Sequence, residues 1–140
     1  MAEEVRRNWL RRIIGVLICL SPLVYLLASL FHATGKDAKP TFENLNFYIG
    51  GAIFACINFY LTFIRATLWR LRRKSMDEWK NVSGLPTIGT FCIFVACYFS
   101  FGAFGSTLVG LVILILDTGG LPWIVIFTWK DTGLWDAKTT

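Results

Sequence analysis

Asp117 is the residue whose type and position point most directly to chemistry. It is the only acidic residue within an apolar stretch, because residues 85–116 and 118–129 carry no charged side chain. A carboxylate inside a membrane is costly, so such residues usually face the protein interior or a water-filled cavity and serve a function. The following residues, Thr118-Gly119-Gly120-Leu121-Pro122, favour the end of a helix. We therefore expect Asp117 in a polar cavity at a helix break formed by Gly119, Gly120 and Pro122; the alternative is a turn at the membrane surface.

Asn58 is the residue expected to pair with Asp117, with Arg65 as the weaker choice, and Thr62 belongs to the same expected intramembrane polar site. Thr62 lies four residues after Asn58, and Arg65 lies three residues after Thr62, so the three side chains share one face of a helix. Asn58 and Asp117 lie 11 and 10 residues from the outer ends of their predicted spans, which places them within about 2 Å in depth. Arg65 lies about 12 Å nearer the cytoplasm and is expected to reach the lipid headgroups. The Asn58–Asp117 pair is either functional or a structural bond of a neutral Asp117.

Membrane-spanning helices are the elements that must position these residues. The chain has 140 residues, is 55% hydrophobic and has a mean hydropathy of +0.57, which is too apolar for a small domain in water. A span needs about 20 apolar residues. The sequence therefore predicts one all-α domain over residues 1–140, with spans at 13–31, 47–69, 86–104 and 107–129, and with the last helix broken between Asp117 and Pro122.

Two alternatives stay open for residues 85–129. This region could cross once, giving three spans in all, or form a re-entrant hairpin; the four-span prediction places a sharp reversal at Gly102–Ser106. The run Ile13–Phe31 is longer than the apolar part of a secretory signal peptide, which is about 7–15 residues. We therefore predict that it is a retained first span.

The basic residues predict the orientation. Four spans place 12 of the 14 lysines and arginines on the side of both termini, which predicts that this side is the cytoplasm. The basic loop 70–84 and the polar tail 130–140 then lie in the cytoplasm. The residues expected to hold the topology or bind lipid headgroups are Arg65, Arg70, Arg72, Arg73 and Lys74. A basic cluster beside a span needs no nucleic-acid partner to explain it.

The remaining patterns argue against catalysis and cofactors. The four cysteines all lie in apolar runs without metal-ligand spacing, so we expect buried thiols, no metal site and no cofactor. No hydrolase, metalloprotease or nucleotide-binding motif is present, so no enzymatic activity is expected. Pairs of small residues four apart, such as Gly51 and Ala55, favour close helix packing within the bundle and would also suit a homo-oligomer.

The plan of a short chain with three or four spans, basic cytoplasmic loops and no catalytic motif resembles the small multi-pass inner-membrane immunity proteins of bacteria. The segments Gly84-Leu85-Pro86-Thr87-Ile88-Gly89 and Asp117-Thr118-Gly119-Gly120-Leu121-Pro122-Trp123 look like family signatures. The resemblance implies protection against a pore-forming or membrane-acting toxin whose inserted helices the protein binds. The rival expectations are a small transporter or channel subunit that uses Asp117, and an accessory subunit of a larger membrane complex.

Overall fold

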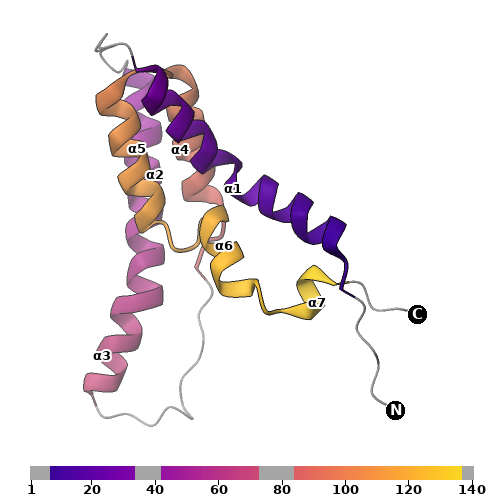
Figure 1. The fold of residues 1–140 in the computed structure, drawn as a ribbon. Helices are drawn as coiled ribbons and strands as arrows, with labels where there is room; N and C mark the ends of the chain where they lie inside the picture. The colour runs from indigo at the N-terminus through magenta and orange to yellow at the C-terminus, as the bar shows by residue number, and fades with distance from the viewer. Residues whose placement is uncertain (1–6, 34–41, 73–83, 137–140) are drawn as a thin grey trace, which may run out of the picture.

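The computed structural model describes residues 7–33, 42–72 and 84–136, and every regular element in these ranges is helical. The elements are α1 (Trp9–His32), α2 (Phe42–Phe59), the π-helix η1 (Tyr60–Ile64), α3 (Arg65–Leu71), α4 (Ile88–Phe99), α5 (Phe104–Leu116), α6 (Leu121–Thr128) and α7 (Thr132–Trp135). Helices α2, α4 and α5 pack into one bundle, while α1 leaves the bundle and its N-terminal part runs past α6 and α7 (Figure 1). The predicted all-α class is confirmed for the described residues.

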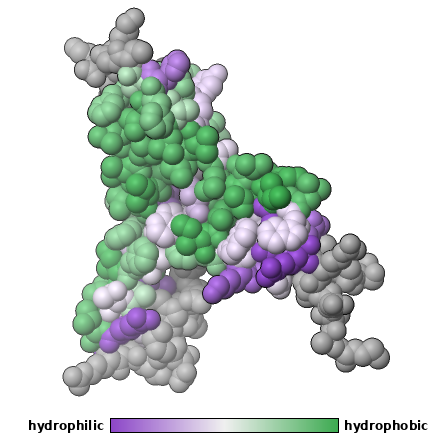
Figure 2. All heavy atoms as spheres, in the orientation of Figure 1, coloured by the Kyte–Doolittle hydropathy of each residue, from purple (hydrophilic) through white to green (hydrophobic). Residues whose placement is uncertain are grey.

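Three helical segments of the described chain are long and apolar enough to cross a membrane: Trp9–His32, Asn44–Leu71 and Phe104–Thr128. Figure 2 shows hydrophobic residues covering the bundle, with hydrophilic residues at its ends and around α7. Many large apolar side chains point outward, among them Leu17, Phe91 and Ile115. Soluble monomers rarely expose so large an apolar surface. These are the features of a membrane protein.

The second helical segment is continuous from Phe42 to Leu71 and therefore extends past both ends of the predicted span 47–69. Its middle is interrupted by the π-helix η1, which begins two residues after Asn58. A π-turn inserts an extra residue into the helical repeat and often marks a functional position. Here the change of helical period begins just after Asn58 and includes Thr62, two residues of the predicted polar site.

α4 departs most from the sequence prediction. The predicted span covers residues 86–104, but the helix covers only Ile88–Phe99, which is 12 residues or about 18 Å. The hydrocarbon core is about 30 Å thick, so α4 is too short to cross it alone. The backbone of Leu85 is bonded to Asn58 in the interior of the second segment, and the chain therefore reaches this depth before α4 begins. Four full-length spans are not confirmed.

The predicted span 107–129 consists of two helices, α5 and α6, separated by residues 117–120. The expected helix break is therefore present. Pro122 lies in the first turn of α6 and not in the gap itself. A backbone N–H at this position has no partner within the helix, so proline costs the helix no hydrogen bond. The reversal between α4 and α5 occupies residues 100–103, and Gly102 adopts a φ of +81° in it, a conformation that glycine reaches without steric cost.

The core of the bundle is closed by glycines as well as by large apolar side chains. Leu26, Ile93 and Leu114 are fully buried where α1, α4 and α5 meet. A Cβ on Gly51 would lie 2.6 Å from Cδ1 of Ile93, and a Cβ on Gly110 would lie 2.6 Å from Sγ of Cys97. The small residues therefore bring helices of this one chain together, as is usual in membrane bundles.

The two ends of the described chain are joined by a terminal clasp, formed by Asn8, Arg12, Trp129 and Asp136. The carboxylate of Asp136 accepts hydrogen bonds from Nε and Nη2 of Arg12, at 2.9 and 2.7 Å, and from the backbone N–H of Asn8, at 3.0 Å. Nη1 of Arg12 donates to the carbonyl of Trp129, whose ring lies 5.1 Å from the guanidinium carbon. These contacts hold the start of α1 against the segment that follows α6, and the sequence analysis did not foresee them.

Candidate functional site at a helix break

Asp117 ends α5, and its side chain is completely buried. After it, residues 118–120 are non-helical and α6 begins at Leu121. A buried carboxylate must be stabilised by hydrogen bonds, because it has left water. Asp117 therefore lies at a helix break and is enclosed by the protein.

Two side chains bond the Asp117 carboxyl group, one on each oxygen. Oδ1 accepts from Nδ2 of Asn58 at 2.7 Å, and Oδ2 accepts from Oγ1 of Thr90 at 3.1 Å. The first contact is the pairing predicted from equal depth in the membrane, and it is confirmed. The second was not predicted, since Thr90 lies in an apolar run that gave no reason to select it. Asn58 and Thr90 are both about 1% exposed, so the whole triad is enclosed.

Asn58 also fixes the chain that leads into α4. Its Oδ1 accepts from the backbone N–H of Leu85 at 3.0 Å, and its Nδ2 donates to the carbonyl of Leu85 at 3.1 Å. One amide side chain thus satisfies both backbone groups of a non-helical residue, which would otherwise be unpaired within an apolar environment. Asn58 therefore links three segments: the middle of the second helical segment, the entry to α4 and the break after α5.

Four glycines surround the triad and leave no room for a side chain. A Cβ on Gly84 would lie 2.5 Å from Oδ1 of Asn58, and one on Gly119 would lie 2.5 Å from its Nδ2. A Cβ on Gly89 would lie 2.6 Å from Oδ2 of Asp117, and one on Gly120 would collide with Oγ1 of Thr90. Both segments singled out in the sequence, 84–89 and 117–123, therefore line the same polar centre.

Thr87 carries local backbone strain beside this centre. Its φ is +67°, a left-handed conformation that is unfavourable for a β-branched residue. Its backbone N–H donates to the carbonyl of Gly119 at 3.0 Å, which joins the start of α4 to the break. Strained residues of this kind persist where the surrounding structure holds them, and they are concentrated at functional sites.

Thr62 lies close to the break without contacting Asp117. Its hydroxyl pairs with the hydroxyl of Thr118 at 2.9 Å, and the residue belongs to the π-helix η1. The sequence predicted that Thr62, Asn58 and Asp117 belong to one polar site. The structure brings it to the neighbouring residue of the break, where it forms a separate hydroxyl pair.

Helix ends supply the electrostatic environment of Asp117. The first turns of α4 and α6 both lie beside it: Thr90 of α4 bonds its carboxyl group, and the N–H of Leu121 donates to Oγ1 of Thr90 at 3.2 Å. Helix N-termini carry partial positive charge and favour an anion. Asp117 itself caps the C-terminal end of α5, where the partial charge is negative, so helix ends of both signs meet at this side chain.

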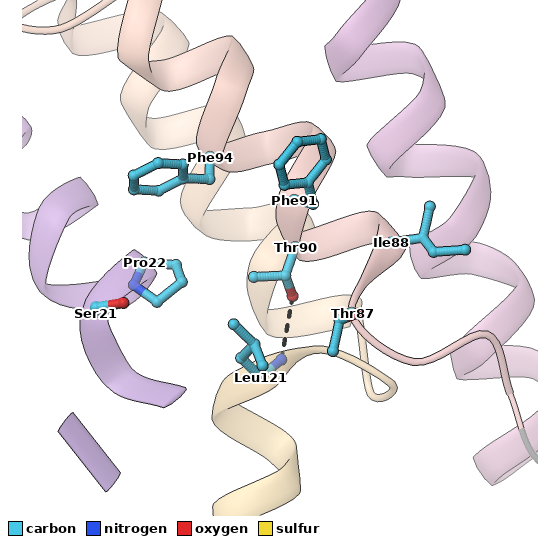
Figure 3. Close-up of a pocket in the computed structure, with 8 residues that line it drawn as sticks. All are labelled: Ser21, Pro22, Thr87, Ile88, Thr90, Phe91, Phe94 and Leu121. Atoms are coloured by element: carbon cyan, nitrogen blue, oxygen red, sulfur yellow. Dashed lines mark hydrogen bonds between the residues drawn. The ribbon is translucent and has the colours of Figure 1, made fainter. Parts of the chain in front are cut away.

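Two cavities border the triad. The first, of about 510 Å³, opens between α1 and α4 and is shown in Figure 3; Ser21 and Pro22 line it from α1, and Thr90, Phe91 and Phe94 line it from α4. The second, of about 630 Å³, lies between the second helical segment and α6. Its lining includes Asn58, Thr62, Thr118 and Phe127. Thr90 borders the first cavity and Asn58 the second, and each of these two side chains bonds one oxygen of the buried Asp117 carboxyl group.

The predicted basic anchors lie away from this centre. Arg65 begins α3, while Arg70 and Arg72 are exposed at its end. Arg73 and Lys74 fall outside the described residues. No group of three or more histidine, cysteine or acidic side chains that could hold a metal ion occurs in the described parts of the chain.

Comparison with known proteins adds no relative. No protein-family model matches the chain, and neither a curated protein nor a solved structure is significantly similar to it.

Proposed function

We propose that this chain is a multi-pass protein of the bacterial inner membrane that acts without catalysis, as an immunity protein that binds the inserted helices of a membrane-acting toxin. Both termini are proposed to lie in the cytoplasm. The proposal combines the sequence resemblance with the shape of the membrane-embedded surface. Helix association within a bilayer depends on close packing and on interhelical hydrogen bonds.

The cavity between α1 and α4 is the observation that carries this proposal. It opens where α1 diverges from the bundle, and its lining combines the aromatic rings of Phe91 and Phe94 with the hydroxyl groups of Ser21 and Thr87 (Figure 3). An apolar helix that presents a side chain to this cavity gains packing contacts there and finds hydroxyl partners for a small polar group. The closed hydrogen-bonded centre at Asp117 keeps the floor of the cavity fixed, since Thr90 belongs to both.

The orientation has independent support. The terminal clasp brings Asn8 and Asp136 together, so the two ends of the described chain lie on the same side of the protein. Figure 1 shows the end of α3, with its exposed Arg70 and Arg72, towards the same end of the molecule. This arrangement agrees with an even number of crossings and with basic residues facing the cytoplasm.

Co-expression in a bacterial host tests the proposal. The protein is produced together with the product of the gene next to its own, with toxicity measured as loss of membrane potential and of viability. We expect the wild-type chain to restore both. Ser21→Phe, which fills the cavity, should abolish protection, whereas Gly105→Phe should not, because no atom lies within 4 Å of a Cβ at Gly105. Both variants must accumulate in the membrane at wild-type levels. Failure of the wild-type chain to relieve any toxicity would reject the immunity function.

The pair of cavities around Asp117 favours a second candidate function, that of a small transporter or channel subunit. Discontinuous helices that end near the bilayer midplane form the binding sites of many transporters. In proteoliposomes, such an activity would give a pH-dependent ion flux that Asp117→Asn abolishes. A flux that is absent from wild-type proteoliposomes would exclude this candidate and leave the immunity proposal unaffected.

A further inference from the structure

We propose that the cavity between α1 and α4 holds one acyl chain of an anionic phospholipid, with the phosphate of that lipid beside Arg11 at the start of α1. The lipid belongs to the leaflet on the side of the two ends of the described chain, which is the cytoplasmic leaflet in the orientation proposed above. The site needs no toxin, and a toxin helix that enters the cavity would displace this chain.

The walls of the cavity are mainly apolar. Figure 3 shows Pro22 of α1, Phe91 and Phe94 of α4 and Leu121 of α6 around a space of about 510 Å³. None of the described side chains that line it is charged. An apolar cavity stays dry and binds apolar molecules. Hydrocarbon is therefore the ligand chemistry that these walls favour.

Two hydroxyl groups of the lining are already bonded within the protein. The hydroxyl of Ser21 donates to the carbonyl of Ile18 in its own helix at 2.8 Å. The hydroxyl of Thr90 is bonded to the carboxyl group of Asp117 and to the backbone N–H of Leu121. A polar ligand that leaves water must regain its hydrogen bonds, whereas a hydrocarbon chain has none to regain. The bonding of these hydroxyl groups therefore also favours an apolar ligand.

The cavity is continuous with the lipid-facing surface of α1. Ile14, Leu17 and Ile18 lie within the two turns before Ser21, and about half or more of each of these apolar side chains is exposed. Residues three or four apart in a helix lie on one face, so the three form an apolar stripe that leads to the cavity. On the α4 side, Phe91 is also largely exposed. A hydrocarbon chain that follows this stripe enters the cavity without crossing a polar surface.

The length of this path matches one leaflet of a bilayer. Arg11 lies three residues before Ile14 and ten before Ser21, which is about 15 Å along α1. The hydrocarbon core is about 30 Å thick, so one leaflet contributes about 15 Å. Trp9 is exposed at the same end of α1, and tryptophan is enriched at the level of the headgroups. An acyl chain whose headgroup lies at Arg11 therefore reaches the cavity.

Charge favours an anionic headgroup at the start of α1. Arg11 is exposed, whereas the guanidinium of Arg12 is buried in the ion pair with Asp136. A guanidinium group binds phosphate oxygens through paired N–H donors, and the cytoplasmic leaflet carries the anionic lipids. This end of α1 thus offers one basic side chain to a lipid and keeps the next inside the protein.

Native mass spectrometry of the detergent-purified protein tests the position of the chain. Dioleoyl-phosphatidylglycerol is added to delipidated protein, and the fraction that carries one lipid is measured. We expect saturable binding of one lipid per chain, and weaker binding of dihexanoyl-phosphatidylglycerol, whose chains are too short to reach the cavity from Arg11. Ser21→Phe, which fills the cavity, should remove most of this dependence on chain length. Gly105→Phe is the control and should retain it, because a Cβ at Gly105 meets no atom within 4 Å.

The headgroup is tested with dioleoyl-phosphatidylethanolamine, which has no net charge. The wild-type chain should bind the phosphatidylglycerol several-fold more tightly. Arg11→Gln should weaken the binding of phosphatidylglycerol by roughly fivefold. Arg72→Gln is the matched control, since Arg72 is exposed after the end of α3 and away from the start of α1, and should leave this binding unchanged. The binding of phosphatidylethanolamine should change little in either variant.

Three results would overturn the inference. Lack of saturable binding to the wild-type chain would show that there is no lipid site. An unchanged dependence on chain length in Ser21→Phe would show that the chain lies elsewhere. Equal losses in Arg11→Gln and Arg72→Gln would show a general attraction between charges.

Circular dichroism verifies that each variant is folded, and Ser21→Leu takes the place of Ser21→Phe where the larger side chain prevents folding. None of these measurements involves a toxin. The lipid site and the immunity function can therefore fail independently of each other.

Discussion

The amide of Asn58 and the carboxyl group of Asp117 are 59 residues apart in the chain and meet at 2.7 Å inside the protein. This one contact ties the middle of the longest helical segment to the break between α5 and α6. Because Asn58 also holds the backbone of Leu85, three separate parts of the chain depend on a single side chain. The predictions below follow from this arrangement and from the terminal clasp.

Asn58→Leu should destabilise the protein by about 1–3 kcal/mol, because it leaves a buried carboxyl oxygen and both backbone groups of Leu85 without their partner. Thermal unfolding in detergent measures the change. Asn46→Leu is the matched control: Asn46 is exposed on the same helix, and its replacement should alter stability by no more than about 0.5 kcal/mol. Equal effects of the two substitutions would contradict the role assigned to Asn58.

Gly89→Ala should destabilise the protein by about 1–3 kcal/mol, since the new Cβ would lie 2.6 Å from Oδ2 of Asp117, whose carboxyl group is held in place by Asn58 and Thr90. Gly105→Ala serves as the control. Its Cβ would meet nothing within 4 Å, and alanine is the better helix former by up to about 1 kcal/mol. The same denaturation experiment should therefore show that Gly89→Ala lowers the free energy of unfolding and that Gly105→Ala raises it.

Thr87→Gly should stabilise the protein by about 1 kcal/mol, because glycine adopts a φ of +67° without the steric cost that threonine carries. Thr67→Gly should have the opposite effect and cost about 0.5 kcal/mol or more, since Thr67 lies in the regular helix α3. Both changes can be compared by their unfolding midpoints. A destabilising Thr87→Gly would show that the threonine side chain contributes more at this position than the strain removes.

The terminal clasp should respond to acid. The Arg12 guanidinium and the Asn8 N–H lower the pKa of Asp136 from 3.8 to about 2, so the folded state favours the carboxylate. The stabilisation of the folded protein by the ionised Asp136 is therefore complete above pH 3.8 and is lost as the pH falls through about 2. Asp136→Asn should lower the unfolding temperature at neutral pH, and its difference from the wild type should narrow only below about pH 4. If the difference in unfolding temperature between the wild type and Asp136→Asn stays constant as the pH is lowered to about 2, the ion pair does not make this contribution.

Reporter fusions check the arrangement in the membrane. A reporter placed after Ala38 should be active outside the cytoplasm, and one placed after Thr140 should be active inside it, because the basic residues gather on the side of the termini. Identical compartments for the two fusions would refute the proposed orientation. Since the terminal clasp joins the two ends, Arg12→Glu should weaken this contact without inverting the topology.

The sequence was sufficient to predict the helical class, the apolar segments and the break after Asp117, because these depend on local composition. Charge-free stretches, glycines and prolines act on the backbone within a few residues of where they occur. Equal depth along two straight helices was even enough to pair Asn58 with Asp117. That calculation needed only the rise per residue and not the identity of the neighbouring helices.

Only the tertiary structure decided the remaining features. α4 is about two-thirds as long as its predicted span, because the chain reverses at residues 100–103 and because Leu85, just before the helix, is bonded to a residue 27 positions earlier, a contact that no local signal encodes. Thr90 and Asp136 gained their roles in the same way, since each lies in an unremarkable stretch and meets its partner from a distant part of the chain. Composition determines which residues enter the membrane, whereas pairing between segments far apart in sequence determines which polar groups meet there.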